Sequence, residues 1–226
     1  IMIDFISKEL SATGFDLYDE ILRPSTGFTS QLPVLLAEYT FYDERDIKDY
    51  LGLLSITPDF FAQIIEFEKK KSQQGLFMAD FAADDIVQQC NNFTEEPENN
   101  YLLSTFDSRI AEMSDVLTQE QMDAYIMQNR QLVLEKLIPA YRVLAGEVAA
   151  LKGSGKNSGG LCGLPKGREY YCRLVTDVTG SDLSVTEMQK QTEQQRRQDM
   201  EDMKALAQKN PDIGQKCANY QLPTED

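Results

Sequence analysis

The feature that most constrains the fold is a long amphipathic segment over residues 118–152. Along it, apolar side chains recur in steps of three, four or seven, at Met122, Ile126, Val133, Leu137, Tyr141, Leu144, Val148 and Leu151. This spacing keeps one face of a 3.6-residue helix apolar. Such a helix would extend roughly 50 Å, whereas a compact domain of this chain length has a radius of gyration of roughly 17 Å. We therefore expect the helix to cross the whole molecule, with the other elements packed along it.

Two local signals shape this segment. Thr118 and Gln121 have the spacing of a capping box, in which each side chain satisfies a backbone N–H group at the helix start. Pro139 lies inside the apolar pattern and lacks the N–H group that an interior residue donates. The segment is therefore predicted to begin at Thr118 and to bend or split near residues 135–138.

Apolar periodicity, Pro and Gly predict further helices on both sides. They cover residues 1–14, 30–39, 43–54, 57–71, 80–93, 101–113, 165–179 and 184–208. Pro33 is expected in the first turn of its helix, Thr57 as the cap before Pro58, and Ser184 with Glu187 as a second capping box. Because only a short turn separates the helices over 43–54 and 57–71, they should form an antiparallel pair. The tail after residue 210 should be irregular.

The expected fold class is all-α: a multi-helix array packed along a long, proline-bent central helix. No segment alternates apolar and polar residues for long, and no run of eighteen apolar residues is present. We expect a single helical domain over residues 1–226. The chain begins at Ile1 and shows no signal peptide, which indicates a processed or excised piece of a longer protein.

Charge and composition argue against several classes of function. With 22 Lys and Arg against 37 Asp and Glu, the formal net charge is −15. An acidic surface repels phosphate backbones and anionic membranes, so no nucleic acid partner is expected. The chain has no histidine, which excludes H-E-x-x-H zinc sites, Ser-His-Asp triads and Cys-His dyads made within it.

The four cysteines, Cys90, Cys162, Cys172 and Cys217, are too few for a disulfide scaffold, and none forms a C-x-x-C pair. We expect buried or half-buried free thiols. One disulfide bridge is the alternative if the protein works outside the cell. Their scattered spacing disfavours a zinc site made of cysteines alone.

A glycine-rich loop over residues 153–160 contains Gly155 and Lys156 but does not fit a phosphate-binding loop. Ala150 stands where that pattern needs its first glycine, and Asn157 stands where it needs Ser or Thr. We expect a flexible surface connection. The acidic clusters elsewhere in the chain are expected to be solvated surface.

The residues just after this loop are the candidates for ligand contacts. Paired tyrosines beside cations are suited to lining a binding cleft. The candidate cleft-lining residues are Lys166, Arg168, Tyr170 and Tyr171. The alternative is that one tyrosine belongs to the core and the other is half-exposed. No catalytic or metal-binding residue is predicted in this chain.

Three stretches carry a family resemblance. They are SQLPVLLAEYTFYDERDIKDYLGLL (residues 30–54), GLFMADFAADDIVQQC (75–90) and GLCGLPKGREYYCRLVTDVTGSDLSVTEM (160–188). Their most specific parts are the Gly-Leu-x-x-Leu-Pro-x-Gly-x-x-Tyr-Tyr pattern and the Thr-Gly-Ser-Asp that follows. Together they resemble the bacterial family known as domain of unknown function 885, in its Firmicute lipoprotein-like branch.

The resemblance implies a mostly helical protein longer than this chain. Family members carry a His-Glu motif suggestive of a zinc metallopeptidase in their C-terminal half, so the chain matches the N-terminal half only. Zinc would then belong to the full-length parent, and the partner of this chain would be the missing C-terminal half, with a peptide as a further candidate ligand. The branch implies an extracytoplasmic protein, anchored to the membrane by an N-terminal lipid.

Two functions therefore compete. The first is the non-catalytic helical part of a zinc metallopeptidase-like protein whose metal motif lies downstream. The alternative is a self-sufficient helical module that binds a peptide or protein without enzymatic activity. A downstream His-Glu motif in the parent gene would favour the first, and a natural stop near Asp226 would favour the second.

The last long helix has few apolar residues, and they form a thin stripe: Val185, Met188, Met200, Met203 and Leu206. Such a stripe buries little area, so the helix gains little from packing. We expect Met200, Met203 and Leu206 to be exposed and the helix to be among the most mobile parts of the chain.

Overall fold

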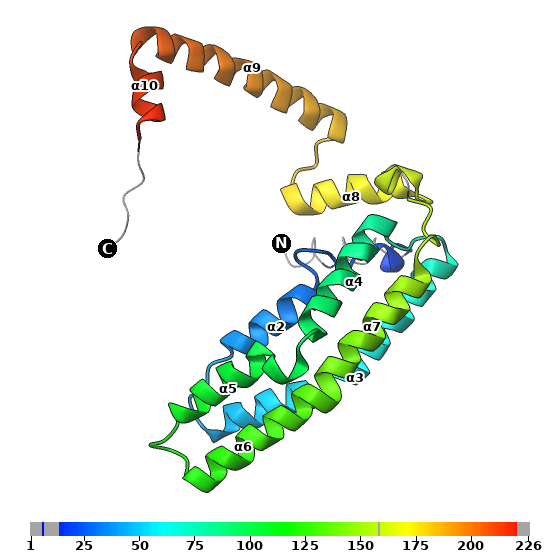
Figure 1. Cartoon of the computed structure of the whole chain (residues 1–226). Coiled ribbons are helices and arrows are strands. Elements are labelled where there is room, and N and C mark those ends of the chain that lie inside the picture. The colour runs from blue at the N-terminus through cyan, green and yellow to red at the C-terminus, as the bar shows by residue number, and fades with distance from the viewer. Residues whose placement is uncertain (1–5, 7–13, 158, 221–226) are drawn as a thin grey trace. The chain divides into compact units, whose positions relative to one another are not determined.

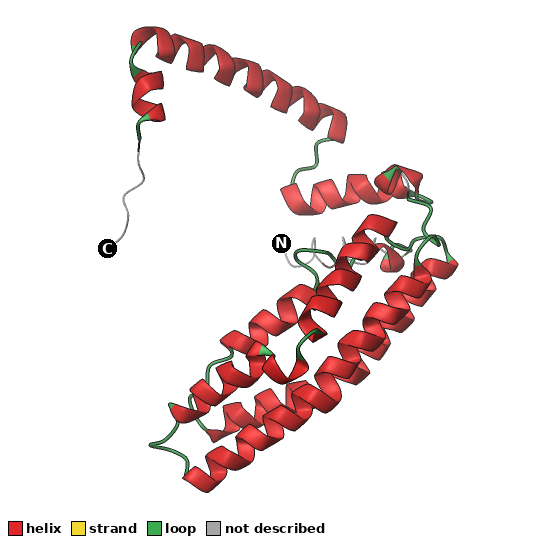
Figure 2. Cartoon of the chain, in the orientation of Figure 1, coloured by secondary structure: helices red, strands yellow, loops and turns green. Residues whose placement is uncertain are grey.

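The computed structural model describes residue 6 and residues 14–157 and 159–220. Throughout these ranges the regular structure is helical and no strand occurs, as Figures 1 and 2 show. The predicted all-α class is therefore confirmed, whereas the helix expected before Gly14 lies almost wholly outside the described residues.

The chain divides into two compact units, Ile1–Gly167 and Arg168–Asp226, which are described separately. The single domain over residues 1–226 stays a prediction. None of the described helices is long and apolar enough to cross a membrane.

The first unit contains most of the helices, and the second begins just inside α8. In chain order the helices are η1 (Asp16–Tyr18), α2 (Phe28–Glu38), α3 (Glu44–Gln73), α4 (Asp80–Thr94), η2 (Pro97–Asn99), α5 (Tyr101–Ala111), α6 (Gln119–Leu132), η3 (Val133–Leu137), α7 (Ile138–Leu151), η4 (Gly160–Gly163), α8 (Gly167–Thr179), α9 (Val185–Lys209) and α10 (Ile213–Ala218). In Figure 1, α4 and α5 lie one after the other along the length of the first unit, and α6 and α7 form a second such line. With α2 and α3, they make a bundle of four helical columns.

The central helix is present and runs unbroken from α6 through η3 to α7. Its capping box of Thr118 and Gln121 is confirmed. The predicted irregularity before Pro139 is a π-helical turn, in which the N–H group of Ile138 donates to the carbonyl of Val133. The extra residue in this turn lets the helix pass a proline that cannot donate. α6 packs against α3 and α5, and α7 packs against α3 and α4, so this column is central as predicted.

The face of the central helix that the sequence predicts to be apolar is the face that is buried. Its innermost side chains are Val133, Leu137, Tyr141, Leu144 and Val148, while Glu135 is exposed. The Tyr141 ring lies 5.0 Å from the ring of Phe61 on α3 and 4.5 Å from the ring of Phe93 on α4, between centroids. This aromatic cluster joins three of the four columns.

One prediction about the first unit is wrong, because residues 44–73 form a single helix rather than an antiparallel pair. Pro58 lies in the interior of α3. The Thr57 hydroxyl does not cap a new helix, but donates to the carbonyl of Leu53 one turn back, at 2.9 Å. An interior proline costs a helix one hydrogen bond. Burial of α3 side chains on both sides of Pro58 offsets this cost.

The position of Pro33 also differs from the prediction. α2 begins at Phe28, so Pro33 is an interior residue and cannot donate to the carbonyl of Thr29. The Tyr141 hydroxyl on α7 donates to that carbonyl instead, at 3.0 Å. A buried carbonyl freed by proline is thus satisfied from another column of the bundle.

The second unit contains little buried surface. Ser184 and Glu187 form the predicted capping box at the start of α9, and no residue of α9 is buried. The exposed fractions of Met200, Met203 and Leu206 are 45%, 64% and 52%, which confirms the prediction that they are exposed. The tail predicted to be irregular contains the short helix α10.

The cysteine prediction is correct in part. All four are free thiols, but only Cys90 is buried, within α4. Cys162, Cys172 and Cys217, which lie in η4, α8 and α10, are exposed.

Candidate functional site

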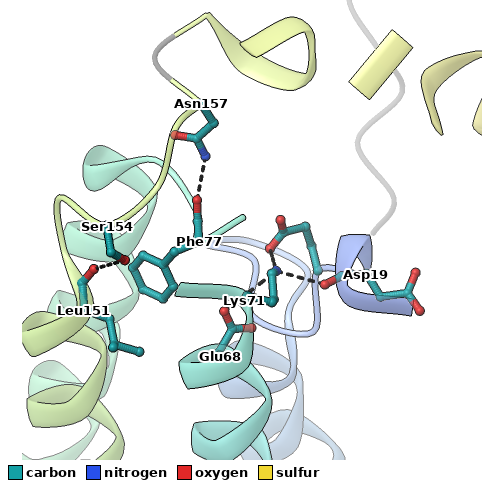
Figure 3. Close-up of polar contacts among 8 residues, drawn as sticks. Asp19, Glu68, Lys71, Phe77, Leu151, Ser154 and Asn157 are labelled. Atoms are coloured by element: carbon teal, nitrogen blue, oxygen red, sulfur yellow. Dashed lines mark hydrogen bonds and ion pairs between the residues drawn. The ribbon is translucent and has the colours of Figure 1, made fainter. Parts of the chain in front are cut away.

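A buried charge at the C-terminal end of α3 marks one end of the first unit. The side chain of Lys71 has no exposed surface. Its Nζ donates to Glu20 Oε2 at 2.7 Å and to the backbone carbonyl of Asp19 at 2.9 Å, as Figure 3 shows. A buried ammonium group needs such partners, because leaving water costs several kcal/mol. Lys71 therefore holds the segment after η1 against the end of α3.

Glu68 lies one turn before Lys71 and is also buried, with 1% of its surface exposed. Its carboxylate is 3.7 Å from Lys71 Nζ, which is an ion pair but too long for a hydrogen bond. Neither carboxylate oxygen accepts a hydrogen bond from the described part of the chain. Burial raises the pKa of Glu68 to about 7, and the nearby Lys71 ammonium opposes this rise.

The glycine-rich loop is held against the segment that joins α3 to α4. The N–H group of Lys156 donates to the carbonyl of Gly75, and the Asn157 amide donates to the carbonyl of Phe77, each at 2.9 Å. A Cβ atom on Gly155 would lie 2.2 Å from the Phe77 carbonyl oxygen, so only glycine fits this approach. The prediction of a flexible connection is therefore wrong for residues 153–157.

Beside these two features is an open hollow of about 620 Å³ in the surface of the first unit. Its polar lining includes the carboxylates of Glu20 and Asp80, and the exposed Phe81 ring also lines the hollow. Asp80 accepts a hydrogen bond from the N–H group of Gly153 at 2.8 Å, which fixes its position. The rest of the lining comes from Ala79, Gly153, Gly155, Asn157, Gly160, Leu161 and Leu164. Carboxylates beside an aromatic ring and leucines suit a cationic or amphipathic group better than an anion.

The four predicted cleft-lining residues fall on both sides of the boundary between the two units, which lies after Gly167. Lys166 ends the first unit's loop with a φ of 52° and is exposed, as is Arg168. Tyr170 is buried and Tyr171 is 46% exposed. Within the second unit, Tyr171 lines a shallow groove between α8 and α9, beside Val175, Val185, Met188, Gln189, Thr192, Glu193 and Arg196. A ligand role for Lys166, Arg168, Tyr170 and Tyr171 stays a prediction.

The residues of this chain do not fit a zinc site. It has no histidine, and in the described ranges no three His, Cys, Asp or Glu side chains converge as metal ligands. Cys90 is enclosed in the core, where burial raises its thiol pKa to about 12 and so disfavours the thiolate that binds metal.

Sequence reasoning missed the buried pair of Glu68 and Lys71. The charges over residues 68–71 fall at the end of the helix predicted over residues 57–71, where lysines stabilise the negative pole of a helix in any case. The signal that could have revealed the pair is the spacing of the buried face of α3: Thr57, Phe61, Ile64, Glu68 and Lys71 follow one another in steps of three and four. That spacing places both charges on the apolar stripe.

Comparisons with known proteins agree with the helical architecture. A solved structure, the putative lipoprotein from Colwellia psychrerythraea, aligns with a TM-score of 0.69 at 22% identity, over 76% of this chain and 30% of that chain. This likeness concerns the fold alone, and the present chain spans less than a third of that protein. No curated protein matches the chain. The model of the family described as "Bacterial protein of unknown function (DUF885)" matches residues 1–221, and the chain therefore belongs to this family.

Proposed function

We propose that this chain is the non-catalytic helical part of a longer, zinc metallopeptidase-like protein whose metal motif lies downstream of residue 226. The observation that carries the proposal is one of length. The family model matches residues 1–221 of this chain, and the structural alignment, over 76% of this chain, covers only 30% of the solved Colwellia protein. The expectation of zinc comes from the family resemblance. It does not come from the residues of this chain, which has no histidine.

In this proposal the first unit is a scaffold and the remaining polypeptide is its partner. The scaffold role is supported by the long central column, which α3, α4 and α5 all contact. Zinc would be held entirely by residues outside this chain, so no step of the reaction is assigned to any residue here. A peptide is the substrate class that follows.

The proposed location is outside the cytoplasm, with the parent protein anchored by an N-terminal lipid, as in the Firmicute lipoprotein-like branch. The description of the Colwellia protein as a lipoprotein supports this location. The test is labelling of the parent with a radioactive or clickable fatty acid, with a Cys→Ala variant of its lipidation site as control. Labelling that does not depend on that cysteine, or no labelling, would contradict the anchor.

One observation favours the alternative, a helical module that binds a peptide without catalysis. The hollow lined by Glu20, Asp80 and Phe81 offers carboxylates and an aromatic ring within one unit. Such a surface suits a basic peptide. In that case the chain would bind a lysine-rich peptide without any downstream domain.

The experiment that separates the two functions compares the 226-residue chain with the protein encoded by the full parent gene. We expect stoichiometric zinc after dialysis, and cleavage of a quenched fluorescent peptide library, from the full-length protein only. A parent gene that stops at residue 226, or zinc-dependent turnover by the short chain, would overturn the proposal. Binding of a lysine-rich peptide by the short chain, lost in Asp80→Asn, would favour the module.

A further inference from the structure

Helices α2 and α3 lie antiparallel, and ring contacts at two places define how they align. At one end, the ring centroids of Phe28 and Phe60 are 4.7 Å apart. At the other end, those of Tyr39 and Tyr50 are 5.8 Å apart. From Phe28 to Tyr39 the residue numbers increase along α2. Their partners on α3, from Phe60 to Tyr50, decrease by nearly the same number of residues. The two helices therefore keep one register between the contacts.

This register brings two apolar stripes together. On α2, Phe28 is followed by Leu32 and Leu35 at helical spacing, and on α3, Phe60 is preceded by Ile56 and Leu53. Residues spaced by three, four and seven share one flank of a helix. Leu32 therefore falls opposite Ile56, and Leu35 falls opposite Leu53. We call the surface formed by Phe28, Leu32, Leu35, Leu53, Ile56 and Phe60 the α2–α3 seam.

The seam is apolar and yet largely open to solvent. The exposed fractions of Leu35, Ile56, Leu53 and Phe60 are 60%, 56%, 44% and 40%. The backbones of α2 and α3 do not approach each other as closely as those of the other neighbouring columns, which leaves this side of the bundle the least closed. The α2–α3 seam is thus a continuous patch rather than scattered exposed side chains, and such patches mark interaction surfaces.

The seam is also poor in charge. None of its six residues is charged, and among the residues next to them in the sequence only Asp59, beside Phe60, carries a charge, although charged residues make up 26% of the chain. Depletion of charge is typical of the centre of a protein interface rather than of solvated surface.

Two observations indicate what covers the seam. A second copy is a poor occupant, because each copy carries a formal net charge of −15 and like charges repel. A segment of the same polypeptide avoids the entropy of association, since the linker holds it at high effective concentration. The solved relative contains a large amount of chain beyond the matched part.

We propose that the α2–α3 seam is the docking surface for an amphipathic helix from the part of the polypeptide outside residues 1–226. This inference rests on the proposed function, in that it requires a longer parent. From Phe28 to Leu35 the seam is about 10 Å long, or two helical turns. The docked helix should therefore present Leu, Ile or Phe at positions i, i+3 or i+4, and i+7, without a charge between them.

The test introduces a charge into the seam and compares the 226-residue chain with the full-length protein. The variants are Leu35→Glu and Ile56→Glu, and the matched control is Val34→Glu. Val34 is 44% exposed and next to Leu35 in the sequence, but lies about 100° away around α2. In the short chain all three variants should shift the thermal midpoint by similar small amounts. In the full-length protein the two seam variants should lower it by roughly 5–10 °C more than the control.

Equal shifts for seam and control variants in the full-length protein would overturn the inference. So would a dimer of the short chain, seen by sedimentation, that Leu35→Glu dissociates, since the occupant would then be a second copy. These failures are distinct from a failure of the proposed function. A full-length protein that holds no zinc, but in which the seam variants alone are destabilising, would contradict the zinc proposal and support the docking surface.

Discussion

Two long helices of the chain, α3 and α9, begin alike but differ sharply in burial. Each starts with a capping box, Asp43 with Asp46 in α3 and Ser184 with Glu187 in α9. Ten of the 30 residues of α3 are buried, whereas none of the 25 residues of α9 is. The comparison teaches that capping determines where a helix starts and that apolar volume determines whether it is buried.

The reason for the difference is visible in the apolar stripes. In α3, apolar residues recur in nearly every turn from Ile47 to Ile65. In α9, the stripe is interrupted, because no apolar residue occurs between Met188 and Met200. A helix without a continuous stripe cannot pack along its length, since most helical stability in proteins comes from burying an apolar face.

The largest expected effect comes from removing a core side chain of α3. Phe61 is 1% exposed and its ring contacts those of Tyr141 and Phe28. We expect Phe61→Ala to lower the free energy of unfolding by about 3–5 kcal/mol, measured by urea denaturation. The control Met203→Ala in α9 should stay within about 0.5 kcal/mol. A comparable loss in the control would mean that α9 has a packed partner, and the comparison would fail.

The next effect concerns buried and exposed charges. Lys71→Met should lower the free energy of unfolding by about 2–3 kcal/mol, because it leaves Glu68 buried without its counter-charge. Protonation of Glu68 limits the loss. In α9, Arg197→Met removes an exposed pair with Glu193 and should cost about 0.3 kcal/mol. The double variant Glu68→Leu with Lys71→Met should recover part of the stability lost in Lys71→Met. If it recovers none, the charge is not the source of the loss.

The pH dependence of stability should distinguish Glu68 from Glu193. Burial raises the pKa of Glu68 from 4.5 to about 7, so the folded state holds its proton more tightly than the unfolded state. The contribution of this proton to the free energy of unfolding is complete below pH 4.5 and is lost as the pH rises through 7. The free energy lost is no more than about 3 kcal/mol. Glu68→Gln should remove this slope in pH-dependent denaturation. An unchanged slope in the variant would assign it to other groups.

Glu193 should affect the pH dependence of stability in the opposite direction. Hydrogen bonds from Arg196 and Arg197 lower its pKa to about 2. Its contribution is therefore present above pH 4.5 and lost as the pH falls toward 2. Because the Glu193 side chain is 45% exposed, salt screens this contribution, and Glu193→Gln should leave the slope between pH 4.5 and 7 unchanged.

The smallest effect tests the two capping boxes. Thr118→Ala, at the start of the central helix, should lower the global free energy of unfolding by about 1 kcal/mol. Ser184→Ala removes an equivalent cap from α9, but should speed hydrogen exchange only in the first turns of α9, because those residues are not buried. Protection of residues 184–208 as strong as that of residues 118–152 would contradict the difference between the two helices.

The sequence allowed much of the fold to be predicted, and the errors have a common origin. The central helix, α4, α5, α9 and both predicted capping boxes follow from periodicity and cap chemistry, which act within a few residues. The break expected at Thr57 and Pro58 rested on the same local chemistry and was wrong. There the long-range packing of α3 outweighs one lost hydrogen bond.

The candidate site was predictable to a smaller extent. The sequence drew attention to the glycine-rich loop and to Tyr171, which lines a groove in the second unit. It did not predict that Glu20 and Lys71 meet, because 51 residues separate them. Nor did it predict that the loop residues bond to the carbonyls of Gly75 and Phe77.

By itself, the sequence determined the all-α class, the apolar face of each main helix, the exposure of the α9 stripe and the lack of any histidine. These properties depend on residue type and on spacing along one helix. The tertiary structure alone decided that α3 passes Pro58 without a break, and that a carbonyl freed by Pro33 accepts a hydrogen bond from Tyr141. It also decided that Lys71 is enclosed. The physical reason is that each outcome depends on a partner far away in sequence, such as Thr29 and Tyr141, which are 112 residues apart.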